Sequence, residues 1–222
     1  MKTIGILLAV MIVAGVSAAA AIPVGDDASA GEEGLAKVKV KGLDAVYAQP
    51  GADLSGYTKI MLDPVEVAFS KNWRPDIPGG EVTAEDRQKI REGVARVLRE
   101  RLAKALESSS RYALVDLPGP HVLRIKADIR DLYITAPDIP TTGITRNYAF
   151  SAGEMTLVAE LRDAPSGALI ARVIDRKKDP DTTWIRWTTR VSNTAAAERA
   201  VDDWVRILLR QLDAAHSVGT TS

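Results

Sequence analysis

Few side chains in this sequence are suited to acid–base, nucleophilic or metal chemistry. The chain has 222 residues, with two histidines, His121 and His216, and no cysteine. The lack of cysteine excludes a disulfide framework, a zinc ribbon, an iron–sulfur cluster and a thiol nucleophile, and two histidines are too few for a multi-histidine metal site. The sequence also has no phosphate-binding loop, nucleophile elbow, zinc-protease motif or dinucleotide fingerprint. We therefore expect no metal, no cofactor and no enzymatic activity.

The charged residues of the central segment do not form a catalytic pair. Glu154 and Glu160 share one face of an expected strand, but six residues at ~3.3 Å each separate them by ~20 Å. Glycosidase carboxylates lie roughly 5–9.5 Å apart, so these two are excluded as direct partners. We expect Asp128 and Arg130 on the solvated face of a sheet. We expect His216 at a helix C-terminus, where a cation is favourable.

Three tryptophans in expected loops are the candidates for a binding surface. They are Trp73, Trp184 and Trp187, with Arg74 and Arg186 beside them. Tryptophan and arginine are enriched at binding surfaces. The alternative is that the rings pack inward and cover the ends of the sheet. If residues 184–187 are extended, the two rings of that segment point to opposite faces; in a helical turn they share a face.

The elements that must position these residues are read from hydrophobic periodicity. Apolar residues alternate with polar ones or cluster between turn signals, which predicts strands. These strands cover residues 37–41, 44–48, 59–63, 65–69, 112–115, 121–134, 153–162 and 168–174. The lysines at 37, 39 and 41 predict an edge strand, because lysine prevents edge-to-edge pairing. The apolar positions shift after Asp131, which predicts a bulge or bend near Arg130. Long loops are expected at 70–80, 135–151 and 176–190.

Two segments have the spacing of amphipathic helices. The first covers residues 84–107 and follows Thr83, a suitable N-cap. The second begins after Ser192 or Thr194 and ends near His216 and Gly219. Strands, a helix, strands and a second helix predict an α+β fold, with one mixed or mainly antiparallel sheet and two amphipathic helices packed on one face.

The N-terminus has the order of a secretory signal peptide. Lys2 is followed by an apolar run over residues 4–16 and by small residues at 17–21, which is the arrangement that signal peptidase recognises. We expect cleavage between Ala18 and Ala21. An uncleaved segment that tethers the protein to the inner membrane is the alternative.

The domain boundaries follow from this order. We expect a signal peptide at 1–21, a flexible tether at 22–34, one α+β domain at 35–216 and a polar tail at 217–222. The precursor has 29 basic and 29 acidic residues; removing residues 1–21, which hold Lys2 and no acid, leaves a formal net charge of −1. This balance argues against a nucleic-acid partner, which would need a positive excess.

Three stretches together resemble a known bacterial family. They are residues 44–73, which include DAVYAQPGADLSGY and IMLDPVEV, residues 161–173, and the terminal helix with Trp204. The resemblance is to a bacterial lipoprotein family known only as domain of unknown function 3313, and it covers roughly residues 34–212. Members of that family typically carry a lipobox cysteine. Here the corresponding residues are 16–20, Val-Ser-Ala-Ala-Ala, so the resemblance implies an envelope protein without a lipid anchor.

The sequence therefore leads to two functional hypotheses. The first is an exported, periplasmic, non-enzymatic protein of the cell envelope that binds another envelope protein or assists an assembly. The second is an exported hydrolase or carbohydrate-binding protein that uses the loops around Trp73 and around Trp184–Trp187. The membrane is a partner only if the signal segment is uncleaved.

Overall fold

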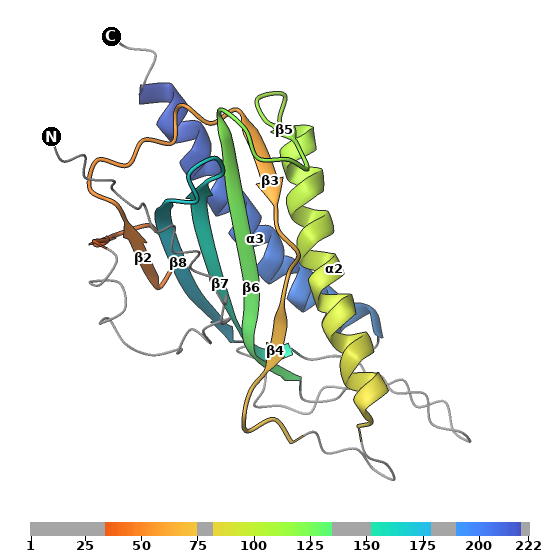
Figure 1. Ribbon diagram of the computed structural model, residues 1–222. Helices are drawn as coiled ribbons and strands as arrows, with labels where there is room; N and C mark the ends of the chain where they lie inside the picture. Colours follow the sequence, from red (N-terminus) through yellow and green to blue (C-terminus); the bar gives the residue numbers. More distant parts are fainter. Residues whose placement is uncertain (1–33, 75–81, 135–151, 179–189, 219–222) are drawn as a thin grey trace, which may run out of the picture.

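The computed structural model describes residues 34–74, 82–134, 152–178 and 190–218. Within these ranges, eight strands form one mixed sheet and two helices cover one of its faces (Figure 1). The expected signal peptide at 1–21, the expected tether up to residue 33 and residues 219–222 of the expected tail lie outside the described residues.

The sheet has the strand order β1-β2-β8-β7-β6-β3-β5, and β4 pairs separately with β6. The elements along the chain are β1 Ala36–Val38, β2 Ala45–Ala48, β3 Lys59–Leu62, β4 Val67–Phe69, α2 Ala84–Ser108, β5 Ala113–Leu114, β6 Val122–Ile134, β7 Ala152–Asp163, β8 Leu169–Lys178 and α3 Arg190–Val218. The α+β fold with one mixed sheet is therefore confirmed.

Three long antiparallel strands form the centre of the sheet. Ala127 of β6 lies opposite Ala159 of β7, which lies opposite Val173 of β8. β2 and β1 extend this side in antiparallel pairing, whereas β3 and β4 run parallel to β6 and β5 runs parallel to β3. The expected turn between β7 and β8 is present, with φ of 72° at Gly167, a backbone conformation that glycine adopts without steric cost.

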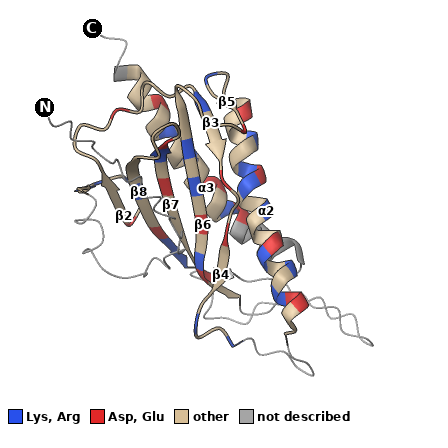
Figure 2. Ribbon diagram, viewed as in Figure 1, with Lys and Arg blue, Asp and Glu red and all other residues tan. Residues whose placement is uncertain are grey.

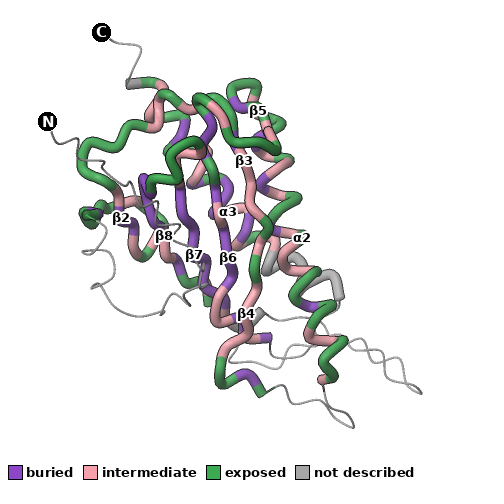
Figure 3. The backbone as a smooth tube through the Cα atoms, in the orientation of Figure 1, coloured by how far each residue is buried: buried purple, intermediate pink, exposed green. Residues whose placement is uncertain are grey.

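The core lies between the sheet and the two helices. Ile129 and Leu157 from the sheet pack with Leu98 of α2 and with Val201 and Trp204 of α3, and all five are buried. Figure 3 shows the buried residues concentrated along β6 and β7. Both helices therefore bury their apolar stripes against one face of the sheet, as the sequence predicts.

Helix α2 begins with a complete capping box. The Thr83 hydroxyl oxygen accepts a hydrogen bond from the Asp86 backbone N–H at 3.1 Å, and an Asp86 carboxylate oxygen accepts one from the Thr83 backbone N–H at 3.0 Å. These bonds satisfy two backbone donors at the helix start. Lys, Arg, Asp and Glu alternate along the rest of the helix (Figure 2), as expected for a solvated face.

The predicted irregularity in β6 is confirmed. Asp131 has a φ of 49°, and the register with β7 shifts between Arg130 and Tyr133. The expected edge strand is also confirmed, because β1 pairs with β2 alone among the described strands. β1 ends at Val38, however, so Lys39 and Lys41 follow the strand and do not lie on it.

Helix α3 differs from the prediction at its start. It begins at Arg190, before the expected N-caps Ser192 and Thr194, and it ends at Val218, within the expected range from His216 to Gly219. Serine and threonine cost less than about 0.7 kcal/mol each inside a helix relative to alanine, so neither residue has to mark a helix start.

Strand β8 is longer than predicted. The expected strand ends at Ile174, but β8 continues to Lys178, into the segment expected to be a loop. Arg176 lies opposite Thr156, and Lys178 lies opposite Glu154. Arg176 also forms an ion pair with Glu154. These cross-strand contacts extend β8 through a charged segment that the sequence pattern does not identify as a strand.

Candidate functional site

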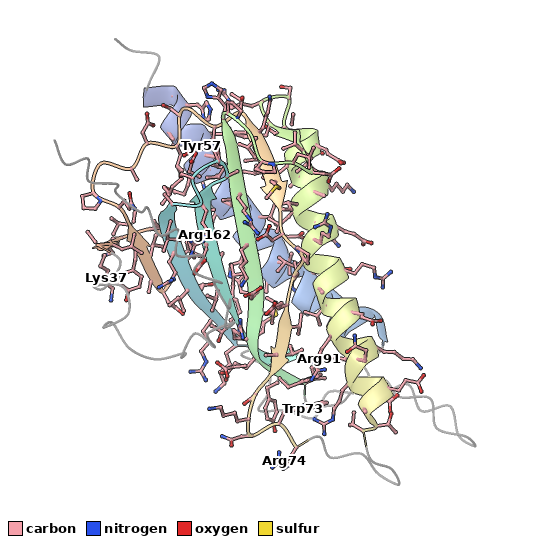
Figure 4. All side chains as sticks on the ribbon, viewed as in Figure 1. Lys37, Tyr57, Trp73, Arg74, Arg91 and Arg162 are labelled. Atoms are coloured by element: carbon pink, nitrogen blue, oxygen red, sulfur yellow. The ribbon has the colours of Figure 1, made fainter. Side chains whose placement is uncertain are left out.

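Trp73 is a buried packing residue, which corrects its assignment to a binding surface. Its side chain is 2% exposed, and its indole N–H donates a hydrogen bond to the Ile134 carbonyl oxygen at 2.7 Å. Its ring stacks on Phe69 with centroids 4.1 Å apart, and the Arg87 guanidinium lies 5.0 Å from its centroid. The inward-packing alternative is therefore correct for this residue (Figure 4).

The other candidate surface residues are not brought together by the described structure. Arg74 is exposed, and its guanidinium donates a hydrogen bond to the Trp73 carbonyl oxygen at 3.0 Å. Trp184, Arg186 and Trp187 lie outside the described residues, as does the loop 135–151. The loop-based hydrolase or carbohydrate site therefore has one residue, Arg74, at the described surface.

An apolar cavity lies between the sheet and the two helices, and no pattern in the sequence predicted it. Its volume is about 190 Å³. The walls come from β1, β2, β6, β7, β8, α2, α3 and the adjoining loops, and Gln211 is the only polar residue among those that line it. The cavity therefore suits an apolar group and offers no reactive side chain to it.

Four alanines on adjacent strands explain why there is space under the helices. Ala48 of β2 lies opposite Ala171 of β8, and Ala159 of β7 lies opposite Ala127 of β6. All four line the cavity. Because Ala171 lies opposite Leu161, two residues along β7 from Ala159, the alanines form a diagonal row across four strands. Larger residues at these positions would fill the space.

The connection between β1 and β2 closes the cavity beside α3. Gly42 in this connection has a φ of 91°, and a Cβ atom added to it would come within 3.1 Å of the Ile207 side chain. The backbone conformation favours glycine here, and a Cβ atom would also require the Ile207 side chain to move slightly. Val40 and Leu43 of the same connection, together with Ile207, line the cavity.

The buried carboxylate of Asp175 connects several elements that surround the cavity. Asp175 of β8 is 1% exposed. It accepts hydrogen bonds from the Trp204 indole N–H at 2.6 Å and from the Asp44 backbone N–H at 2.9 Å, and it forms an ion pair with Lys177 at 2.9 Å. The Arg176 backbone N–H donates in turn to the Asp44 carboxylate at 2.9 Å. Asp175 therefore joins α3, β8 and the start of β2 next to the cavity.

On the opposite face of the sheet, which was expected to be solvated, the charged residues Asp128, Glu160 and Arg172 are buried, whereas Arg130 is partly exposed. Glu160 and Arg172 are each 6% exposed and lie opposite each other on β7 and β8. Their side chains are 3.0 Å apart, and Arg162 also pairs with Glu160 at 2.8 Å. Asp128 is 2% exposed and lies 3.2 Å from Arg130. Each of these buried carboxylates has a cationic partner, as burial of a charge requires.

The environment of Glu160 predicts how the stability of the fold depends on pH. Burial raises the pKa of Glu160, but hydrogen bonds and charges from Arg162 and Arg172 together outweigh burial and lower it below its ordinary value of 4.5. The ionised group therefore stabilises the fold above about pH 4.5, and this contribution is lost as the pH falls through the lowered pKa. We expect Glu160→Gln to be less stable than the parent at pH 7 and to lose less stability below pH 4.5.

Urea unfolding at a series of pH values measures this difference. Glu107→Gln, an exposed position on α2, is the matched control and should keep the pH dependence of the parent. An unchanged pH dependence in Glu160→Gln would show that the carboxylate does not contribute in this way.

The two histidines have structural partners. His121 is exposed, and its Nδ1 lies 2.8 Å from the Gly56 carbonyl oxygen. His216, in the last turn of α3, has Nδ1 2.9 Å from the Leu212 carbonyl oxygen. Nearby, Tyr112 donates a hydrogen bond to Asp213, and burial together with this carboxylate raises the pKa of Tyr112 to about 12.

The described residues contain neither a cluster suited to a metal ion nor a helix suited to cross a membrane. Residues 34–74, 82–134, 152–178 and 190–218 contain no cluster of three histidine, aspartate or glutamate side chains arranged to hold a metal ion. None of the helices in this part of the chain combines the length and the hydrophobicity needed to cross a bilayer.

Comparison with solved structures gives distant similarities. A DUF330-family protein from Xanthomonas campestris is 14% identical with a TM-score of 0.46, over 79% of this chain and 94% of that one. A protein from Caulobacter crescentus CB15, provisionally described as a lipoprotein, is 17% identical with a TM-score of 0.35, over 78% and 98%. The PelC dodecamer from Paraburkholderia phytofirmans is 11% identical with a TM-score of 0.34, over 72% and 98%.

Comparison with protein families gives a match over most of the chain. None of the curated proteins matches it. The family described as "Protein of unknown function (DUF3313)" matches residues 26–208, which include every described strand and most of α3. The membership predicted from the sequence is confirmed, and the chain belongs to the DUF3313 family of proteins of unknown function.

Proposed function

We propose that this protein is exported to the bacterial cell envelope and acts in the periplasm by binding, without catalysis. We assign the binding of an apolar ligand to the cavity between the sheet and the helices. The cavity is the single observation that carries this assignment, because its walls are apolar except for Gln211.

The size of the cavity supports a ligand. Protein interiors are close-packed, with few voids larger than a water molecule. A cavity of roughly 150 Å³ lined by apolar side chains stays dry and binds benzene, and this one has about 190 Å³. An apolar ligand would remove these apolar walls from water, which is favourable in proportion to the apolar area buried.

Filling the cavity by mutation tests the assignment. Ala159→Leu places a larger apolar side chain in the cavity, and we expect it to raise the free energy of unfolding by about 0.5–2 kcal/mol. Toluene should raise the melting temperature of the parent protein and should have a smaller effect on Ala159→Leu. Differential scanning calorimetry with and without toluene measures both effects.

A matched variant distinguishes the effect of filling the cavity from a general effect of introducing leucine. Ala113→Leu makes the same change at an exposed position of β5 and should leave both the stability and the toluene response unchanged. Ala171→Val is a smaller filling substitution in case leucine at 159 prevents folding. If toluene fails to stabilise the parent, or stabilises both filled variants as much as the parent, the cavity is not a ligand site.

Export is supported by the residues before the domain. The sequence combines Lys2, the apolar run at 4–16 and the small residues at 17–21, the order that signal peptidase recognises. Mass spectrometry of the protein from its native host should find an N-terminus between residues 19 and 22. A chain that begins at Met1 or Lys2 would instead support the tethered alternative.

Binding to another envelope protein is the second part of the proposal. The sequence has no catalytic motif, and the family that the sequence resembles is a family of envelope proteins. Both observations favour binding as the main role. Chemical crosslinking in intact cells, followed by identification of the crosslinked species, should recover one reproducible envelope protein. Recovery of the monomer alone, under conditions that crosslink a known envelope complex, would count against a protein partner.

A further inference from the structure

Two arginines of α2 lie over a stacked pair of aromatic rings at one end of the molecule. Phe69, the last residue of β4, and Trp73 have ring centroids 4.1 Å apart and 8° between their planes. The Arg87 guanidinium lies 5.0 Å from the Trp73 centroid, and the Arg91 guanidinium lies 5.4 Å from the Phe69 centroid. Figure 4 shows Arg91, Trp73 and Arg74 at this same end.

The turn after β4 adds two further cations beside these rings. The Trp73 backbone N–H donates a hydrogen bond to the Ser70 carbonyl oxygen at 3.0 Å and closes the turn. The Trp73 ring is buried, whereas Lys71 before it and Arg74 after it are exposed. We call the four side chains of Lys71, Arg74, Arg87 and Arg91 the basic patch.

The acidic residues in the first turns of α2 are already engaged with other groups. Glu85 forms an ion pair with Lys89 at 2.7 Å. Asp86 takes part in the capping box at the start of the helix, and Glu92 accepts a hydrogen bond from the Gln88 side chain at 2.8 Å. None of these contacts reaches the basic patch.

The basic patch has no carboxylate partner in the part of the chain that the structure describes. Within residues 34–74, 82–134, 152–178 and 190–218, no carboxylate oxygen lies within 4.0 Å of any of its four cationic groups. The sequence also has no acidic residue three or four positions away from Arg87 or Arg91, the spacings at which helical side chains meet. Arg101, Arg124 and Arg176, by contrast, each pair with a carboxylate. The positive charge of the basic patch therefore favours an anionic partner.

The arginines of the basic patch keep hydrogen-bond donors for such a partner. A guanidinium has five N–H donors in a planar fork that matches a carboxylate in bidentate geometry. Arg74 uses one N–H group to reach the Trp73 carbonyl oxygen at 3.0 Å. Arg87 and Arg91 contact the aromatic rings and donate no hydrogen bond to a described residue. The rings thus hold the two guanidiniums in place and leave their donors available.

An acidic protein segment fits the basic patch better than an anionic membrane does. Elements that bind a membrane surface combine basic side chains with apolar ones that enter the interface. The exposed large apolar side chains of the described residues are Val38 and Leu117. Val38 belongs to β1 and Leu117 follows β5, so neither lies in the turn after β4 or on α2.

We infer that the basic patch binds the partner protein, and that the partner presents a segment with several carboxylates to it. This inference rests on the second part of the proposed function, because it names the surface that the partner envelope protein contacts. The contact consists of solvent-exposed ion pairs, which salt screens. Its strength therefore falls as the salt concentration rises.

A hexaglutamate peptide is the probe for this surface, and a hexaglutamine peptide is its uncharged counterpart. In about 0.1 M salt, nuclear magnetic resonance titration of the protein should show hexaglutamate binding with a Kd of about 1 mM, with shifts at residues 69–74 and 84–91. Hexaglutamine should not bind, and about 0.5 M salt should weaken hexaglutamate binding. Vesicles that contain phosphatidylglycerol test a membrane surface, and the protein should stay in solution when they are sedimented.

Charge reversal in the turn tests the location of the binding surface. Lys71→Glu combined with Arg74→Glu should weaken hexaglutamate binding about fivefold or more, since each exposed ion pair contributes up to about a factor of five. Lys104→Glu combined with Arg210→Glu makes the same change in net charge at exposed positions. Lys104 is ~25 Å from Arg87 along α2 at about 1.5 Å per residue, beyond the screening length of ~10 Å. This control should bind hexaglutamate as the parent does.

Crosslinking in intact cells separates this inference from the proposed function. The Lys71→Glu, Arg74→Glu protein should lose the crosslinked envelope protein, and the control variant should keep it. If both variants keep it, or if both lose hexaglutamate binding equally, the basic patch is not the contact surface, although the proposed partner stands. A protein that sediments with the vesicles and does not bind hexaglutamate would also overturn the inference. If hexaglutamate does not bind and crosslinking recovers the monomer alone, the inference and the proposed partner both fail.

Discussion

Replacing Asp175 with alanine is expected to lower the free energy of unfolding by about 3–5 kcal/mol. The carboxylate is 1% exposed, and it accepts hydrogen bonds from the Trp204 indole and from the Asp44 backbone N–H. Alanine leaves both donors without this acceptor and removes the anionic partner of Lys177. A decrease of about 10 °C in melting temperature corresponds to a change of this size in a domain of this length.

Asp175→Asn is the control for this prediction. Asparagine has a similar shape and one carbonyl oxygen, so it keeps one of the two acceptors and loses the charge. We expect a loss intermediate between the parent and Asp175→Ala, measured by urea unfolding at pH 7. Because Trp204 lines the cavity, Asp175→Ala should also weaken the response to toluene. If Asp175→Ala were as stable as the parent, the assignment of Asp175 as the residue that joins α3 to the sheet would be wrong.

Local sequence patterns predicted the elements whose structure depends on residues that lie near one another in the sequence. The N-cap at Thr83 depends on Asp86, three residues later, and β6 shows its two faces as an alternation along the chain. Both features are therefore visible in the sequence. The end of β8 and the start of α3 were not visible in the sequence. Arg176 belongs to β8 because it pairs with Glu154 across the strands, and that contact spans more than twenty residues of sequence.

The cavity could not be predicted for the same reason. Ala48, Ala127, Ala159 and Ala171 are unremarkable alternating residues in four separate strands. Only the register of the sheet brings them into one row, and register depends on contacts between distant segments. The buried carboxylate at 175 is hidden in the sequence as well, because its partner Trp204 follows 29 residues later.

Trp73 shows how composition can mislead about a site. A tryptophan among polar residues in a loop has the composition of a binding surface, yet the loop after β4 brings it back onto the end of β6, where its indole N–H reaches the Ile134 carbonyl oxygen. The tryptophan and Phe69 stack in parallel, with 8° between their planes. Because both the ring and its polar atom are used inside the protein, Trp73 has a structural role.

Trp73→Ala is therefore expected to lower the free energy of unfolding by about 3–5 kcal/mol, the range for removal of a buried aromatic side chain. The substitution removes the stacking partner of Phe69, the indole hydrogen bond to Ile134 and the ring beside Arg87. Trp73→Phe keeps an aromatic ring against Phe69 and loses the hydrogen bond, so its loss should be smaller. Arg74→Ala, at the exposed neighbour, should change stability by less than about 0.5 kcal/mol.

The same variants distinguish a structural role from a binding role for this residue. Trp73 does not line the cavity, so folded Trp73→Phe should bind toluene as the parent protein does. Thermal unfolding with and without toluene measures stability and binding in the same experiment. A Trp73→Phe protein with parental stability and reduced toluene binding would reverse this assignment and return Trp73 to the binding surface, whereas reduced stability with unchanged binding is the result that its buried, hydrogen-bonded position predicts.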